Sequence, residues 1–324
     1  MKPNGKIAAV VVLTCAVVGC KRGDAKKTTA ENATPNAVAS LSGSPAAGKA
    51  IDDEGFVGTP SPTVKGPVSF ADAEAAFQSK NYGEATTLFE QYIQRRPDNP
   101  WGHYMLGLSA WKDGRLEVAE TEFTQSLLLD STHLKSCLNL SRVLLEAHRP
   151  GEALTTLDRA LEIDSTSGVA YRLKGNALND LERTDEAVVA YQSAIQLDPE
   201  DAWAMNNLAF IRIREGRYDE ALPALARATE LRKDVPVFYN NLGMALEHGG
   251  HYAAAAEAYG FAVSLDGSNT RAVQNHDRAL SVRDDPSIPA VDLTQLAREF
   301  ESRVLEGALV TTMPADSVVA NQPR

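Results

Sequence analysis

The sequence predicts an all-α protein, a solenoid of six helix-turn-helix repeats followed by capping helices. Two observations carry this prediction. One alanine recurs every 34 residues through most of the chain, and other small or large apolar residues recur at fixed distances from it. Six in-phase copies rule out chance periodicity, and a period of this length is typical of repeats that bury their apolar faces against their neighbours. Alanine is abundant and aromatic residues make up only 6% of the chain, which suits closely packed helices.

The recurring positions indicate two antiparallel helices in each repeat. The recurring alanines are Ala85, Ala119, Ala153, Ala187, Ala221 and Ala255. A ring or leucine follows four residues later, at Phe89, Phe123, Leu157, Tyr191, Leu225 and Tyr259. Twelve residues before each alanine the side chain is small, at Ala73, Gly107, Ser141, Gly175, Ala209 and Gly243. Small residues let helix axes approach, and the ring fills the space one turn beyond the alanine. Turns are expected around Gly114, Gly216 and Gly250.

Two segments resemble the consensus sequence of the tetratricopeptide repeat, Tyr239–Gly243 (YNNLG) and Tyr191–Pro199 (YQSAIQLDP). The resemblance covers about 66–269 and implies a right-handed superhelix of helix pairs. Asp72 and Lys174 depart from the family, which prefers leucine there, and Pro223 falls early in a second helix. We expect the whole solenoid, with its capping helix, to span 66–283.

The C-terminal part, 284–324, is expected to hold one more helix, 293–306, and a frayed tail. In the capping helix that precedes it, one group of residues should face the last repeat and another should face water. The first group is Ala272, Val273, Ala279 and Leu280, and the second is Arg271, Gln274, Asn275 and Arg278. Asp292 is the expected N-cap of the final helix, whose apolar stripe is Leu293, Leu296, Ala297, Phe300 and Val304. This stripe has three alternative interpretations. It packs on the solenoid of the same chain, it forms a homodimer or partner contact, or it occupies the protein's own groove.

The N-terminus resembles a bacterial lipoprotein signal. Lys2 and Lys6 precede a short apolar run that ends in Val-Val-Gly-Cys20, and residues 1–19 are the expected signal peptide. The resemblance implies cleavage before Cys20 and a lipid on its sulfur; an ordinary signal or an uncleaved anchor is the alternative. Lys21 then favours the outer membrane, since aspartate at this place is the familiar inner-membrane cue in that family. Residues 20–65 are poor in large apolar groups and are expected to be a disordered tether. The expected location is the cell envelope, on the periplasmic face of the outer membrane.

Charge and motifs narrow the function. The net charge is −11, and residues 66–324 hold 38 of the 43 acidic groups but only 24 of the 32 basic ones. This acidic body repels nucleic-acid phosphates and anionic lipids, so the membrane is expected to be reached through the lipid alone. No phosphate loop, zinc-binding helix or nucleophile elbow is present, and no cofactor is expected. His248 and His251 lack further ligands for a metal, and Cys137 falls at a core position. We therefore expect that this protein has no enzymatic activity.

The family resemblance implies that the first helix of each repeat lines a concave groove. The groove residues expected to contact a peptide are Lys135, Asn139, Arg142, Arg172, Asn176, Trp203, Asn207, Phe210 and Asn241. Amides there would pair with an extended backbone, and Arg172 would meet a carboxylate. Arg172, Asn176 and Asn207 resemble three elements of a carboxylate clamp, but Val237 and Asn241 stand where its remaining basic residues belong. A general peptide groove and a surface with little affinity are the alternatives.

These features predict a lipid-anchored scaffold or adaptor of the cell envelope that binds protein partners. The alternative is a pilotin-like assembly chaperone for pilus or secretin subunits. An enzyme is the third interpretation, which the absence of catalytic motifs disfavours. The architecture resembles outer-membrane tetratricopeptide lipoproteins of both kinds.

Overall fold

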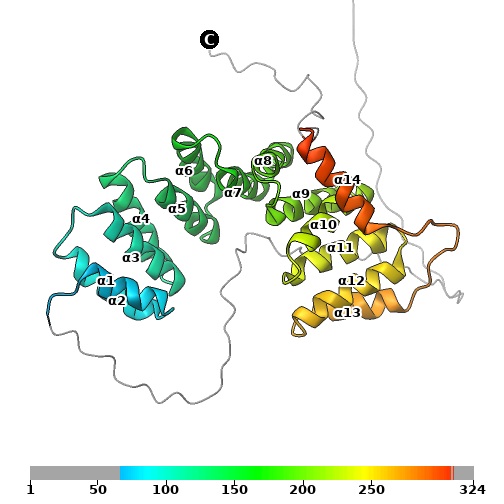
Figure 1. Cartoon of the computed structure of the whole chain (residues 1–324), viewed down its shortest axis with the longest axis horizontal. Helices are drawn as coiled ribbons and strands as arrows, with labels where there is room; N and C mark the ends of the chain where they lie inside the picture. Colours follow the sequence, from blue (N-terminus) through cyan, green and yellow to red (C-terminus); the bar gives the residue numbers. More distant parts are fainter. Residues whose placement is uncertain (1–65, 308, 310–324) are drawn as a thin grey trace, which may run out of the picture. The chain divides into compact units, whose positions relative to one another are not determined.

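The computed structural model describes residues 66–307 and 309, and its regular structure is entirely helical (Figure 1). The first helices of the repeats, with the cap as the last, are α1 (Phe70–Gln78), α3 (Pro100–Lys112), α5 (Leu134–Glu146), α7 (Gly168–Asp180), α9 (Ala202–Arg214), α11 (Pro236–His248) and α13 (Thr270–Leu280). The second helices are α2 (Tyr82–Ile93), α4 (Leu116–Leu129), α6 (Pro150–Ile163), α8 (Thr184–Leu197), α10 (Tyr218–Leu231) and α12 (Tyr252–Leu265). The last helix is α14 (Leu293–Leu305). None of the described helices is long and apolar enough to cross a bilayer.

The predicted all-α repeat array is confirmed. From α3 to α13 every first helix begins 34 residues after the previous one. The first repeat is shorter, because α1 begins only at Phe70, where Ser69 and Asp72 form a capping box. The predicted signal peptide, Cys20, the tether and the tail from 310 onward lie outside the described residues.

The recurring alanines lie where the two helices of each repeat pack most tightly. All six alanines are completely buried, and so are the rings and leucines four residues later, with only Tyr191 slightly exposed. The small residue of the first helix faces this ring. A methyl group on Gly175 would lie 2.5 Å from the ring of Tyr191, and one on Gly243 would lie 2.6 Å from the ring of Tyr259. Glycine is therefore required wherever a tyrosine occupies the space between the two helices.

A left-handed residue turns the chain from the first helix into the second in every repeat. These residues are Lys80, Gly114, His148, Glu182, Gly216 and Gly250, spaced 34 apart with φ between 57° and 86°. The three glycine turns were predicted. In the other three repeats an ordinary side chain accepts a backbone conformation that costs about 1–2 kcal/mol.

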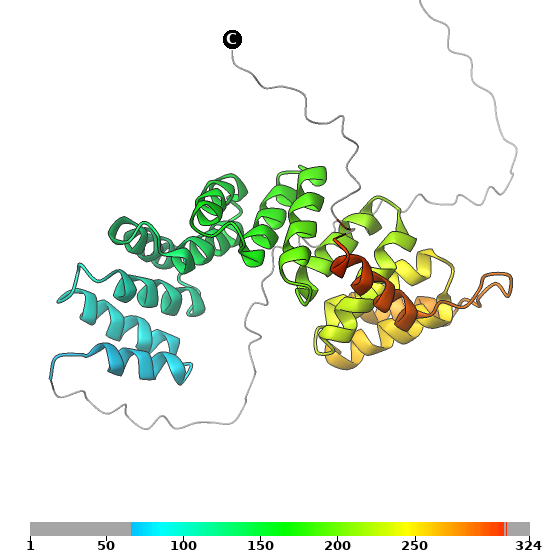
Figure 2. The ribbon, with the colours of Figure 1, turned by 45° about the horizontal axis from the view of Figure 1, so that its top comes forward.

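The first helices lie side by side and form one face of the array. Consecutive first helices, such as α5 and α7 or α9 and α11, contact each other as well as their own second helices. Consecutive second helices do not approach one another in this way within the described chain. Figure 2 shows the helix pairs following one another from α1 to α13. The surface made by the first helices is called the first-helix face below.

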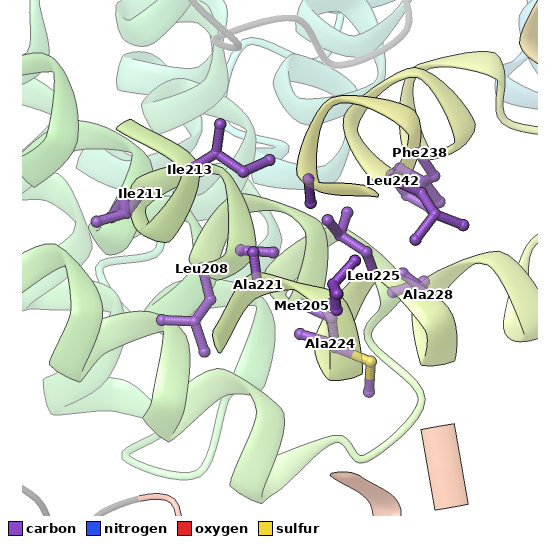
Figure 3. Packing of buried hydrophobic residues seen from close by; sticks show 14 of the residues in the cluster. Met205, Leu208, Ile211, Ile213, Ala221, Ala224, Leu225, Ala228, Phe238 and Leu242 are labelled. Carbon is purple, nitrogen blue, oxygen red and sulfur yellow. The ribbon is translucent and has the colours of Figure 1, made fainter. Parts of the chain in front are cut away.

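The apolar core consists of two clusters that meet inside α7. One extends from Ala73 to Ala177 and the other from Leu178 to Leu309. In the second cluster Met205, Leu208 and Leu225 lie among the side chains of α9, α10 and α11 (Figure 3). Leu154 of α6 packs against both clusters, so the two are continuous across α7.

Two orientations predicted for α13 are wrong. Leu280, expected to face the last repeat, is 63% exposed, whereas Asn275, expected to face water, is buried. Asn275 donates a hydrogen bond to Asn240 on α11, and this contact turns the amide rather than the leucine toward the array. Ala272 and Ala279 face the last repeat as predicted.

Helix α14 folds back on the solenoid, which was one of the three interpretations of its apolar stripe. It packs against α10 and, less extensively, α8, where Ala297, Phe300 and Val304 are buried (Figure 1). Arg227 of α10 donates to Glu301 at 2.6 Å. Both α8 and α10 are second helices. The interpretation that α14 occupies the groove is therefore wrong, and its stripe is used within the chain rather than left for a dimer.

Candidate functional site

The nine predicted groove residues lie on four consecutive first helices, α5, α7, α9 and α11, but they differ in how much of each is open. Lys135 is exposed, and four are half-buried, namely Arg142, Arg172, Asn176 and Trp203. Asn139, Asn207, Phe210 and Asn241 are buried between helices. The open residues of this predicted set thus lie in repeats three to five.

The asparagines of the last repeats bond to one another. Asn241 donates to Asn206 at 2.9 Å, Asn206 donates to Asn207 at 3.2 Å, and Asn207 donates to Asn176 at 2.9 Å. The hydroxyl of Tyr191 also donates to Asn176, at 2.8 Å. This amide chain, Asn241–Asn206–Asn207–Asn176, links α11, α9 and α7. These amides satisfy each other, and this leaves few donors for a peptide backbone.

Arg172 already has a carboxylate partner within the chain. Its Nε donates to Asp201 at 2.7 Å, and the Asp201 side chain is almost fully buried. Asp201 is also the N-cap of α9, where its other oxygen accepts from the backbone of Ala204. The carboxylate that we expected from a partner is therefore supplied by the next repeat. The repeat period could have predicted that Asp201 caps a helix, but not that its side chain contacts Arg172.

Aromatic rings cluster at the N-terminal end of the face. The ring centroids of Trp101 and Tyr104 are 4.9 Å apart, and His133 lies 5.4 Å from Trp101 and 5.0 Å from Tyr104. Lys135 places its ammonium group 5.4 Å from the Trp101 ring, within cation–π range. Burial lowers the pKa of His133, which caps α5 and therefore holds a neutral ring there. We call Trp101, Tyr104 and His133 the aromatic ledge.

Arg142 lies next to this ledge. Its Nη1 donates to Asn139 at 2.5 Å, and Asn139 donates in turn to the hydroxyl of Tyr104 at 3.3 Å. Burial, together with the nearby positive charge of Arg172, lowers the pKa of Arg142 to about 10. The guanidinium still carries its charge at neutral pH. Asn139 thus joins a half-buried cation to the aromatic ledge.

A separate network closes the C-terminal end of the array. Arg278 donates to both oxygens of Glu247 at 2.6 and 2.7 Å, and Tyr259 donates to the same carboxylate at 2.8 Å. Burial by itself would raise the pKa of Glu247, but these hydrogen bonds outweigh it and hold the pKa below its usual value. The carboxylate ties α13 to α11 and α12, which is a structural role.

The sequence offers two candidates for chemistry other than binding, His248 and Cys137. No three His, Cys, Asp or Glu side chains of residues 66–307 lie together as a metal site. His248 stacks on Tyr218, with centroids 4.4 Å apart, so it has a packing role. Cys137 is fully buried, and burial raises the pKa of its thiol. It is therefore an unreactive core side chain.

A cavity of about 1070 Å³ lies on the other side of the array, between α8, α10 and α14. Three arginines of its wall are paired with carboxylates: Arg183 with Glu186 and Arg217 with Glu220, both of the same wall, and Arg212 with Glu215 beside it. These ion pairs neutralise much of the charge of the wall, which also holds Glu182, Asp185, Asp219 and Arg303.

Comparison with known proteins identifies the repeat. Two family models match, one described as "Tetratricopeptide repeat-like domain" over residues 68–206 and one as "Tetratricopeptide repeat" over residues 178–242. The chain is a tetratricopeptide-repeat protein. No match was found among curated protein sequences.

Solved structures share the fold of this tetratricopeptide-repeat chain. One chain of the APC/C hetero-tetramer Cut9–Hcn1 is similar over 65% of this chain and 42% of that chain, with 16% identity and a TM-score of 0.58. The PilF protein of Pseudomonas aeruginosa is similar over 63% of this chain and 88% of that chain, with 19% identity and a TM-score of 0.52. MamA of Desulfovibrio magneticus RS-1 covers 50% of this chain and 91% of its own, with 23% identity and a TM-score of 0.46. At these identities the likeness concerns the fold alone. Repeat arrays of this family are protein-interaction scaffolds, and the first-helix face is the candidate interaction surface.

Proposed function

We propose that this protein is a lipid-anchored scaffold or adaptor of the bacterial cell envelope, which holds an extended segment of a partner protein on its first-helix face. One observation carries the interaction part. In an acidic body, the face presents an open tryptophan, a lysine and a half-buried arginine together, at Trp101, Lys135 and Arg142. Aromatic and arginine side chains are the residues that most often dominate protein interfaces.

The anchoring part is supported by the sequence, where Cys20 directly follows a short apolar run. More than one acyl chain gives stable membrane attachment without a spanning helix. Cys20→Ser should abolish labelling of the protein by a radioactive fatty acid and leave precursor or released protein. Unchanged labelling of this variant would contradict the lipid anchor.

The interaction part is tested by affinity capture from solubilised membranes. Trp101→Ala should weaken capture of the partner several-fold, because Trp101 is 39% exposed and its loss removes contact area rather than core packing. Leu128→Ala is the matched control, since Leu128 is 74% exposed on a second helix, α4. Equal capture by both variants would place binding on another surface.

The identity of the captured proteins separates the adaptor from its alternative. Cell-wall hydrolases or proteases support an envelope adaptor, whereas secretin or pilus subunits support a pilotin-like assembly factor. Catalytic turnover by the purified chain would overturn both.

A further inference from the structure

Arg142 lacks the carboxylate partner that most half-buried arginines of the array have; Arg159, the other half-buried arginine without one, donates to the backbone carbonyls of Leu127 and Ser131 instead. Arg172, Arg212 and Arg227 each have a carboxylate partner, with nitrogen–oxygen distances of 2.6–2.8 Å. Arg142 has no carboxylate of residues 66–307 within ion-pair distance, and its one hydrogen bond goes to the neutral amide of Asn139. Charged groups removed from water are ordinarily paired with an opposite charge, and Arg142 has no such counter-ion among the described residues.

The neighbour of Arg142 strengthens this requirement. Arg172 stands on the next first helix, close enough that its charge lowers the pKa of Arg142. Asp201 neutralises one of the two guanidinium groups, which leaves one uncompensated positive charge at the junction of α5 and α7. A single carboxylate placed here would be attracted by both arginines and would relieve their mutual repulsion.

The aromatic ledge adds a second element next to the charge. Asn139 accepts a hydrogen bond from Arg142 and donates one to Tyr104, so a single amide links the guanidinium group to the aromatic ledge. Trp101, at the outer side of the ledge, is partly exposed and carries Lys135 above its ring. An extended peptide that places a carboxylate at Arg142 would therefore bring a neighbouring side chain over rings.

We propose that Arg142 is the centre of a carboxylate-binding site, and that its ligand is an extended peptide segment carrying an acidic residue beside an aromatic one. The acidic residue binds Arg142, and the aromatic residue packs on Trp101, the exposed ring of the aromatic ledge. The site rests on the proposed function, which supplies the extended segment, and specifies its chemistry. It differs from the clamp considered at Arg172, Asn176 and Asn207, because those three groups are satisfied within the chain. A polyanion is disfavoured by the acidic body around a single uncompensated charge.

The test is selection of a random dodecapeptide phage library on the purified full-length chain, followed by fluorescence titration of the enriched peptides. Enriched peptides should share Asp or Glu close to Phe, Tyr or Trp. Arg142→Gln should weaken their binding about tenfold or more, because a charge-assisted contact is lost. Lys135→Gln, at an exposed position, should weaken it about two- to threefold, and added salt should weaken binding to the wild-type chain.

Arg214→Gln is the matched control, since Arg214 is an exposed arginine on the same face whose Nη1 donates to an amide, Asn179. It should leave binding unchanged, and thermal melts should show that both glutamine variants remain folded. Enriched peptides that are neutral or basic, or acidic peptides indifferent to both Arg142→Gln and Lys135→Gln, would overturn the carboxylate site while leaving the proposed function intact. Enrichment of no peptide at all would overturn the extended-segment mode of binding and the site together.

Discussion

The two halves of the array use the same repeat differently. In the C-terminal half, the amide chain occupies the first-helix face and α14 covers α8 and α10 of the opposite side. In the N-terminal half, the first-helix face carries the aromatic ledge and Arg142, and no described helix covers the second helices there.

This difference shows that equivalent positions make different contacts in the two halves. Asn139, Asn207 and Asn241 occupy the same place in repeats three, five and six. Asn207 and Asn241 bond to amides of neighbouring helices, whereas Asn139 bonds to a tyrosine hydroxyl and orients an arginine. One repeat position therefore serves cohesion in one half, and in the other it belongs to the proposed carboxylate site.

The largest expected effect comes from removing the anchor of α14. Phe300→Ala should lower the free energy of unfolding of the C-terminal half by about 3–5 kcal/mol, because the ring is 4% exposed in its core. Hydrogen exchange followed by mass spectrometry should show lost protection in α8 and α10 and unchanged protection in α2 and α4. Leu305→Ala is the control, since Leu305 is 70% exposed on the same helix and should change stability by less than about 0.5 kcal/mol. An equal loss of protection in both halves would mean that they do not differ in this way.

A middle-sized effect is expected from breaking the amide chain. Asn206→Ala should cost about 1–3 kcal/mol, because Asn206 is fully buried and its loss removes the acceptor of the Asn241 amide NH2 and the donor to the Asn207 carbonyl oxygen. Asn240→Ala, at a half-buried position with one amide partner, should cost about 1 kcal/mol or less. Urea denaturation measures both. Similar costs for the two variants would show that the amide chain contributes little cohesion.

The smallest effect is a gain in the N-terminal half. Lys80→Gly should stabilise the protein by about 0.5–1 kcal/mol, because glycine relieves the left-handed backbone and gives back part of that gain as unfolded-chain entropy. Gly114→Ala, at the equivalent turn of the next repeat, should destabilise by about 1 kcal/mol. A loss of stability in Lys80→Gly would mean that the lysine side chain makes contacts worth more than the backbone strain.

The repeat could be predicted because its signal is periodic. Alanines, rings and glycine turns recur at fixed spacing, and the structure buries or bends the chain at those places. The fold-back of α14 was among the expected arrangements, since a helix with one apolar stripe must cover it.

The details of the site were not predictable in the same way. Arg172 pairs with Asp201, 29 residues later, and Asn241 pairs with Asn206, 35 residues earlier. Such contacts depend on side-chain rotamers and on the offset between neighbouring helices, neither of which the repeat period encodes. The exposed Leu280 and the buried Asn275 have the same origin, because a bond to Asn240 decides which side of α13 faces the array.

The recurring left-handed turn makes the chain modular in whole units. Arginine follows the turn residue in four of the six repeats, at Arg115, Arg149, Arg183 and Arg217. Excision of residues 149–182 would therefore join His148 to Arg183 and recreate the His-Arg step that the chain already has at this turn. Such an array lengthens or shortens in steps of 34 residues without changing its backbone register, while any other insertion interrupts the stacking of helix on helix.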